Sequence, residues 1–147
     1  MSTPHFVEIS DAEWEIMRIV WAKGSLTARE IIDTAFQFLN WKEGTIKSLI
    51  NRLTQKGILI QNTQTKPYLY SASITQDTAN YQNLDVLLNR ICSTKRKEAI
   101  EHLIHNQPLS KSQCQELIQL LEQKLTNAPS QIDCQCHPGQ CNCHSCS

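Results

Sequence analysis

The order of four short patterns in the first 72 residues most constrains how this chain can fold. Ser10-Asp-Ala-Glu13 and Thr27-Ala-Arg-Glu30 both have the spacing of a capping box, so each predicts the start of a helix. An amphipathic segment follows, with apolar residues at the helical positions 46, 49, 50 and 53. Two β-prone runs, 58–62 and 67–71, then flank a polar loop and indicate a hairpin. The sequence therefore predicts a mainly α fold with a small β-hairpin, a winged helix-turn-helix over residues 5–72.

The second half of the chain has apolar stripes but too little mass for an independent core. Residues 81–105 indicate one long helix or two shorter ones broken around Cys92-Ser-Thr94, after a polar connector at 71–80. A third capping box, Ser110-Lys-Ser-Gln113, opens a further helix. Pairing with a second copy of the chain would bury these apolar faces, so we expect a helical dimerisation region over 75–127 and a homodimer.

The segment 43–56 has a polar face opposite its apolar one. Although the net charge of the chain is +0, residues 42–66 hold five basic side chains and one acidic one. Small hydrogen-bonding side chains on this face can approach base edges, and the basic ones lie where phosphates would flank an inserted helix. The candidate DNA-binding residues, with one tyrosine from the hairpin, are Thr45, Lys47, Ser48, Asn51, Arg52, Lys56 and Tyr68.

Two alternatives stay open for these residues. An amphipathic helix of this kind is often only a solvated surface helix, which for the segment 43–56 alone is the commoner case. Tyr68 and Tyr70 share one strand face, so either could pack instead of touching a DNA backbone. The modest charge of one domain also predicts weak DNA binding, which two domains on a palindrome would strengthen.

Five of the seven cysteines lie in the last fourteen residues. The N-terminus has no signal peptide pattern and no apolar stretch is long enough to cross a membrane, so we expect a cytoplasmic protein with reduced thiols. Clustered cysteines in such a protein favour metal binding over disulfides.

The tail, residues 128–147, contains the pattern C-x-C-x₄-C-x-C formed by Cys134, Cys136, Cys141 and Cys143. Four thiolates within ten residues can surround one tetrahedral ion, with Pro138-Gly139 turning the chain. Soft thiolates favour Zn(II) and Cu(I), and the short spacing suits thiolate-bridged Cu(I) more than a structural zinc module. A reactive-thiol redox sensor and a tail without function remain as alternatives.

The other cysteines and histidines are secondary candidates. Cys146 is an auxiliary ligand or an exchange point, and His137 and His144 are expected to be spectators beside so many sulfurs. Cys92 and Cys114 lie on apolar helix faces and are expected to be buried as small hydrophobic residues. No catalytic pattern is present, so the chain is not expected to be an enzyme.

The chain resembles the BlaI/MecI/CopY family of winged-helix repressors over residues 6–126. The resemblance is carried by Ile9-Ser-Asp-Ala-Glu-Trp-Glu-Ile-Met-Arg18, Trp21-Ala-Lys-Gly24, Thr27-Ala-Arg-Glu-Ile-Ile32 and, in the wing, Tyr68-Leu-Tyr-Ser71. The C-x-C-x₄-C-x-C tail is similar to the sensor of the copper-transport repressor branch (CopY-type). The Asn-Phe bond at which the penicillinase-repressor branch is cleaved does not occur in this sequence.

This resemblance implies a copper-responsive repressor of copper-transport (efflux) genes. It implies a homodimer that binds a palindromic double-stranded operator in its Zn(II) form and is released when Cu(I) displaces zinc, with a copper chaperone as a possible donor. Two positions depart from the family pattern: Lys42-Glu43-Gly44 replaces a Ser/Thr-rich helix start, and Lys66-Pro67 replaces a Gly-Arg pair in the wing. A metal buffer or delivery protein, and a repressor that senses zinc or oxidation, are the competing hypotheses.

Overall fold

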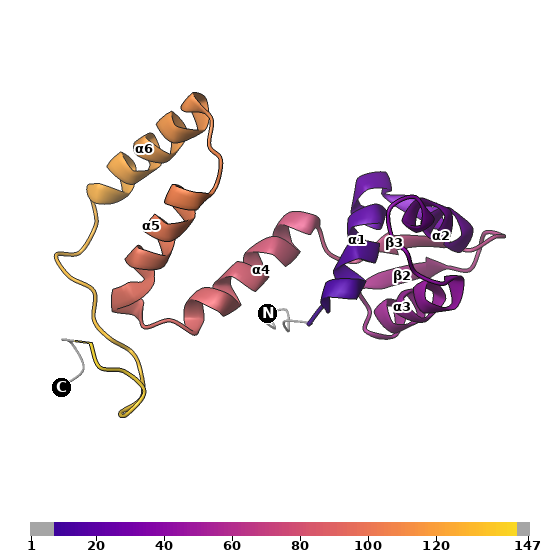
Figure 1. Cartoon of the computed structure of the whole chain (residues 1–147), viewed down its shortest axis with the longest axis horizontal. Coiled ribbons are helices and arrows are strands. Elements are labelled where there is room, and N and C mark those ends of the chain that lie inside the picture. The colour runs from indigo at the N-terminus through magenta and orange to yellow at the C-terminus, as the bar shows by residue number, and fades with distance from the viewer. Residues whose placement is uncertain (1–7, 144–147) are drawn as a thin grey trace. The chain divides into compact units, whose positions relative to one another are not determined.

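A computed structural model describes residues 8–143 of the chain. The backbone forms two compact units, the first ending at Asn83 and the second beginning at Leu84 (Figure 1). Two sequence-based assignments extend beyond the described residues: the start of the winged helix at 5–7, and the end of the tail, which includes His144 and Cys146.

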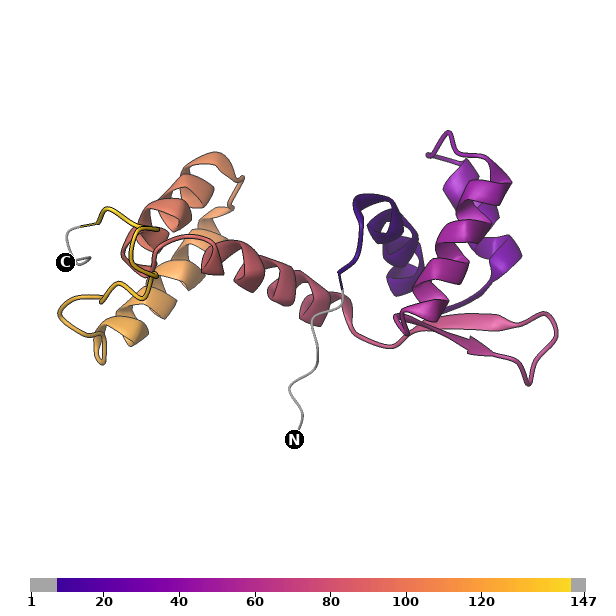
Figure 2. The same ribbon diagram turned by 90° about the horizontal axis from the view of Figure 1, so that it is seen from below.

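The first unit has three helices and a three-stranded antiparallel sheet. Its elements are α1 (Asp11–Lys23), β1 (Ser25–Thr27), α2 (Ala28–Phe36), α3 (Glu43–Gln55), β2 (Leu59–Asn62) and β3 (Leu69–Ala72). The strands lie in the order β1-β3-β2, and the β2–β3 hairpin extends beyond the helices in Figure 2. The predicted winged helix-turn-helix is therefore confirmed.

The helix starts follow the capping boxes. The Ser10 hydroxyl accepts a hydrogen bond from the Glu13 amide at 3.2 Å, and the Glu13 carboxylate accepts one from the Ser10 amide at 3.2 Å. Thr27 and Glu30 repeat this arrangement at α2. These reciprocal bonds satisfy amide groups that a helix cannot satisfy internally. Gly24 ends α1 with φ 91°, a conformation that favours glycine.

The buried core of the first unit brings together apolar residues of all three helices and the sheet. The predicted apolar face of α3 is buried, and it packs with residues of α1 and α2, among them Ile46, Leu49, Ile50, Leu53, Ile16, Met17, Ile31 and Ile32. Burying each of these side chains contributes roughly 1.5–3 kcal/mol. This packing fixes α3 with its polar face outward.

Strand β1 was not expected from the sequence. Its three residues pair with β3 in the register Leu26↔Tyr70. A three-residue strand has no periodicity of its own, so only the presence of β3 beside it makes it a strand.

The expected polar connector at 71–80 is wrong. Strand β3 continues to Ala72, and α4 (Gln76–Asn89) begins soon after it. The Thr75 hydroxyl accepts a hydrogen bond from the Thr78 amide at 3.1 Å, which satisfies one amide of the first turn. The Trp21 indole donates to the Ile74 carbonyl at 2.9 Å and attaches this short link to α1.

The second unit contains the end of α4, a 3₁₀ turn η1 (Ser93–Lys95), α5 (Arg96–Asn106) and α6 (Lys111–Leu125). The expected break near Cys92 and the capping box at Ser110 are both confirmed. No residue of α5 or α6 is buried. The large exposed apolar side chains of these helices are Leu84, Leu87, Ile100, Leu103, Ile104, Leu117, Ile118, Leu120, Leu121 and Leu125. Over the described range, no helix is both long and apolar enough to cross a membrane.

Candidate functional site

The outer face of α3 is the first candidate surface. Thr45, Ser48 and Asn51 are exposed along it, as are Lys47 and Arg52 beside them. Because α3 is fixed by its apolar side, these short polar side chains project from a rigid support. Five of the seven residues expected from the sequence are thus exposed on the same helix.

Glu43 is the acidic residue at the start of this helix. It pairs with Arg29 of α2 and, at 3.4 Å, with Lys47 one turn further along α3. All three side chains are more than a third exposed, and exposed pairs of this kind stabilise a fold by less than about 1 kcal/mol. The pair to Lys47 can therefore be exchanged for a phosphate at little cost. The Lys42 side chain makes no capping hydrogen bond, in agreement with the absence of the family's Ser/Thr-rich sequence at this helix start.

Lys56 is placed differently from the other predicted DNA contacts. Its ammonium donates to the Glu13 carboxylate at 2.8 Å and to the Glu8 carbonyl at 2.9 Å. Glu13 is 1% exposed. Burial by itself raises the pKa of the Glu13 carboxyl, but hydrogen bonds from Lys56 and Ser10 outweigh it and hold the pKa below its usual value. Lys56 therefore compensates a buried charge between α1 and α3.

The hairpin resolves the alternative between the two tyrosines. Tyr70 is 8% exposed and belongs to the core, where its hydroxyl accepts a hydrogen bond from the Gln61 amide at 2.9 Å. Tyr68 lies before β3 and is 41% exposed. Only Tyr68 is therefore available for an outside contact, together with the exposed Lys66 at the tip.

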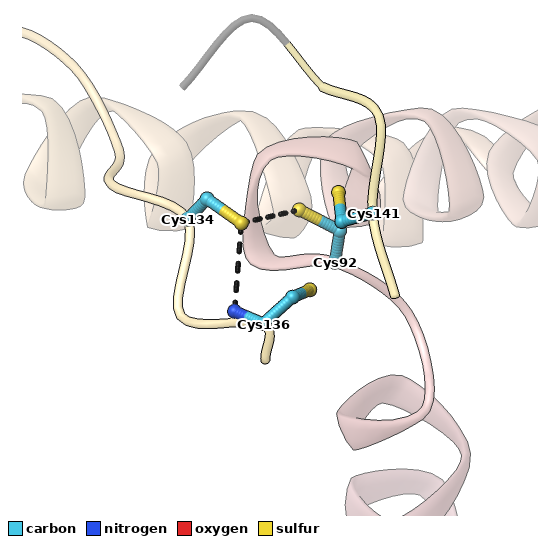
Figure 3. Close-up of side chains that lie close together, drawn as sticks. All are labelled: Cys92, Cys134, Cys136 and Cys141. Atoms are coloured by element: carbon cyan, nitrogen blue, oxygen red, sulfur yellow. Dashed lines mark hydrogen bonds between the residues drawn. The ribbon is translucent and has the colours of Figure 1, made fainter. Parts of the chain in front are cut away.

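The second candidate site is a thiol cluster in the second unit. The sulfur atoms of Cys92, Cys134, Cys136 and Cys141 all lie within 4.8 Å of one another (Figure 3). The Cys92 sulfur is 3.6 Å from that of Cys134 and 3.8 Å from that of Cys143. Zn–S bonds of about 2.3 Å in a tetrahedron would place neighbouring sulfurs about 3.8 Å apart. The donor set and its spacing therefore fit one thiolate-bound ion.

The C-x-C spacing gives both pairs the same local geometry. The amide of Cys136 donates to the sulfur of Cys134, and the amide of Cys143 donates to the sulfur of Cys141, each at 3.4 Å. An amide that points at a thiolate stabilises its negative charge and orients it. The tail backbone is thus suited to hold deprotonated sulfurs.

The cluster also perturbs the pKa values of its thiols. Hydrogen bonds from the side chain and backbone of Thr94 lower the pKa of Cys92 to about 7. Burial and the neighbouring thiols raise the pKa of Cys136 to about 12. Several thiolates cannot crowd together without compensation, and a bound cation is what allows all of them to ionise.

Cys92 is the member of the sulfur group that the sequence did not predict. It was expected to be a buried hydrophobic residue on a helix face, and this is wrong: it lies between α4 and η1, half-buried, with its sulfur in the cluster. The expected helix break at Cys92-Ser-Thr94 was the available signal, since a thiol in a link is accessible to other ligands. Cys114 was also expected to be buried, but it is exposed, because no other segment within residues 8–143 covers α6. His137 is exposed and outside the sulfur group.

Three helices, a hairpin wing and a polar outer face on the third helix define a winged-helix protein of the kind that regulates transcription. The family model described as penicillinase repressor matches residues 9–123. The chain therefore belongs to the penicillinase repressor family of DNA-binding transcriptional repressors, and it is not an enzyme. The matched residues include Cys92 and end before the cysteines of the tail.

The chain is also similar to several individual proteins. An uncharacterised 16.5 kDa protein from the ptsI 3' region of Latilactobacillus sakei is 35% identical over 92% of this chain and 93% of its own length. The penicillinase repressor of Staphylococcus aureus is 31% identical over 78% of this chain and 91% of its own length. The methicillin resistance regulatory protein MecI of Mammaliicoccus sciuri is 28% identical over 80% and 95%. The solution structure of the DNA binding domain of the repressor BlaI aligns at 30% identity with a TM-score of 0.44, covering 47% of this chain and 84% of that one.

Proposed function

We propose that this chain is a copper-responsive transcriptional repressor of copper-transport genes. In this proposal a homodimer binds a palindromic operator in its Zn(II) form, and Cu(I) displaces zinc and releases the DNA. The observation that carries the proposal is the group of four cysteine sulfurs within 4.8 Å of one another in a chain of a repressor family. A bare DNA-binding repressor would not need such a group.

The DNA contacts in this proposal come from α3 and the hairpin. The exposed Thr45, Ser48 and Asn51 face base edges in the major groove, and Lys47 and Arg52 contact phosphates on either side. Tyr68 contacts the flanking backbone from the wing. Lys56 is left out of this set, because its ammonium is engaged with the buried Glu13 carboxylate.

The dimer follows from the exposed apolar side chains of the second unit. Helices α5 and α6 bury no residue in a single chain, and exposed apolar surface of this extent is typical of a subunit interface. Pairing through these helices would cover the apolar faces. It would also supply two recognition helices for a palindrome, which compensates for the modest charge of each domain.

The metal response in this proposal uses the softness of the thiolates. Soft thiolate ligands bind both Zn(II) and Cu(I), and the softer Cu(I) competes well for them. One Zn(II) and two Cu(I) ions carry the same charge, so the exchange leaves the net charge of the tail unchanged. We therefore infer that the signal passes through the shape of the site and its contacts. A copper donor protein is not part of the proposal, since no described residue indicates one.

A mobility-shift titration tests the proposed function. The full-length protein is loaded with Zn(II) and mixed with palindromic DNA from upstream of its own gene and of copper-transport genes of the same genome, and Cu(I) is then added without oxygen. We expect a shifted complex that Cu(I) dissociates, whereas the same amount of additional Zn(II) leaves it intact. The double variant Cys134→Ser/Cys136→Ser, the control that keeps the winged helix, should not respond to Cu(I).

The competing hypotheses give different results in the same titration. A complex that is indifferent to Cu(I) but dissociates with excess Zn(II) or on oxidation would show a zinc or redox sensor. Failure to bind any upstream palindrome, with tight binding of both metals, would show a metal buffer or delivery protein. Either result contradicts the copper-responsive repressor.

A further inference from the structure

The link between α4 and α5 holds Cys92 in a defined conformation. The Arg96 guanidinium donates to the carbonyls of Leu88 at 2.9 Å and Ile91 at 3.1 Å, which ties the end of α4 to the start of α5. The Lys95 amide donates to the Cys92 carbonyl at 2.8 Å and closes the 3₁₀ turn. The Cys92 side chain is therefore presented by an ordered turn.

The tail contacts this link at Ser93 and Lys95, which both follow Cys92. The Ser93 hydroxyl donates to the Asp133 carbonyl at 2.6 Å, next to the first cysteine pair. The Lys95 ammonium donates to the Asn142 side-chain oxygen at 3.4 Å, between the two cysteines of the second pair. Figure 3 shows Cys92 with the tail segment of Cys134 on one side and that of Cys141 on the other. These two side-chain contacts hold both pairs close to one thiol outside the tail.

The distances between sulfur atoms also place Cys92 close to both cysteine pairs of the tail. The Cys92 sulfur lies 3.6 Å from Cys134, a member of the first pair, and 3.8 Å from Cys143, a member of the second. Thiols are weak hydrogen-bond donors and acceptors, so these contacts add little stability by themselves. A shared ion would convert this spacing into strong bonds, because the 3.6 Å between the sulfurs of Cys92 and Cys134 is close to the edge of a thiolate tetrahedron.

We propose that Cys92 is itself a metal ligand, so that a bound ion clamps the cysteine tail onto the link between α4 and α5. The ligand set is Cys92, Cys134, Cys136 and Cys141, the group in which every sulfur is close to every other. The Cys143 sulfur lies 3.8 Å from that of Cys92, and in this proposal it becomes a ligand only when Cu(I) replaces Zn(II). The inference rests on the proposed function only in that the tail binds a soft metal.

Ligation by Cys92 would connect the bound metal to the turn between α4 and α5. In this ligand set a four-coordinate Zn(II) is held by Cys92 and three tail thiolates, and so joins the tail to a turn between helices whose apolar faces are exposed. Cu(I) bridged by the tail thiolates takes fewer sulfurs per ion, which leaves Cys92 out of the site. Exchange of the metals would therefore unclamp the tail from the link.

The experiment compares Cys92→Ser with Cys114→Ser in the full-length, reduced protein. Cys114 is the matched control, because it is an exposed cysteine of α6 outside the sulfur group. Co(II) is the spectroscopic probe, since its charge-transfer absorption grows with the number of bound thiolates. Zn(II) affinity is measured by competition with a chromophoric chelator. Hydrogen exchange of residues 89–96 is followed with and without Zn(II), and Cys92→Ala serves as a second variant in case serine disturbs the turn.

We expect Cys92→Ser to lose about a quarter of the thiolate charge-transfer intensity, as one of four thiolates is removed. We also expect its Zn(II) affinity to fall at least tenfold and the protection of residues 89–96 by Zn(II) to disappear. Cys114→Ser should match the unsubstituted chain in all three measurements. If both Cys92 variants keep full intensity and full protection, the inference is overturned.

The measurements separate this inference from the proposed function. If the unsubstituted chain binds neither Co(II) nor Zn(II), both are overturned. If DNA release by Cu(I) is normal and the Cys92 variants match the unsubstituted chain, the inference alone is overturned. If the Cys92 variants lose a thiolate ligand but the DNA complex ignores Cu(I), the inference is supported and the copper-responsive repressor is contradicted.

Discussion

Replacing Lys56 by methionine is expected to destabilise the winged helix without weakening its DNA contacts. The Glu13 carboxylate is 1% exposed, and one of its oxygens already has no hydrogen-bond partner within residues 8–143. Removing one partner of a fully buried ion pair costs about 3–5 kcal/mol. The Lys56 side chain is 31% exposed, so water can partly replace it, and we expect a loss of about 2 kcal/mol.

Unfolding of the full-length protein by urea or heat, followed by tryptophan fluorescence, measures this loss. All three tryptophans, Trp14, Trp21 and Trp41, lie in the first unit, so the signal reports that unit alone. A loss of about 2 kcal/mol lowers the Tm of a unit of this size by roughly 10 °C. The double variant Glu13→Gln/Lys56→Met, which removes the buried charge as well, should recover part of the stability.

Lys47→Met is the matched control, because it removes the same charge from an exposed position on the same helix. Its stability should change by less than about 0.5 kcal/mol, while its DNA affinity falls. The opposite pattern would refute the reasoning: a Lys56→Met variant with unchanged Tm and lower DNA affinity would place this ammonium on a phosphate.

Three further outcomes follow from the same contacts. The folded-state pKa of Glu13 is below its usual value, so its contribution to stability is present above about pH 4.5 and is lost as the pH falls through the folded pKa. The Tm of Glu13→Gln should therefore fall less between pH 6 and pH 3 than the Tm of the unsubstituted chain. Equal falls in Tm would argue against the ion pair. Ser110→Ala removes the capping box of α6 and should cost about 1 kcal/mol, seen as lower helicity by circular dichroism; unchanged helicity would mean that the cap is dispensable. Arg52→Met should lower DNA affinity and reduce the slope of log affinity against log salt by about 1 per chain, and an unchanged slope would remove Arg52 from the phosphate contacts.

The sequence determined the helices of the winged unit because their signals are local. A capping box spans four residues, as at Ser10 and Thr27. The buried face of α3 follows from the helical spacing of its apolar residues. These patterns act within one helix and need no partner to be recognised. The same is true of the break near Cys92 and of the two pairs of cysteines in the tail.

Other features were decided by contacts between distant segments. Strand β1 exists because Leu26 pairs with Tyr70. Lys56 is not included in the proposed DNA contacts, because its ammonium pairs with the buried Glu13 carboxylate. In both cases the two residues are more than forty positions apart, so no local pattern could relate them.

The sulfur cluster shows both kinds of information in one site. The spacing C-x-C-x₄-C-x-C by itself predicted a soft-metal site in the tail, since four thiolates so close together suit Zn(II) or Cu(I). Only the tertiary structure brought Cys92 to these thiolates, because its position depends on the turn that joins α4 to α5 and on the two contacts that dock the tail there. A periodic pattern can place a residue on a helix face, but the meeting of two segments forty residues apart depends on how the whole chain folds.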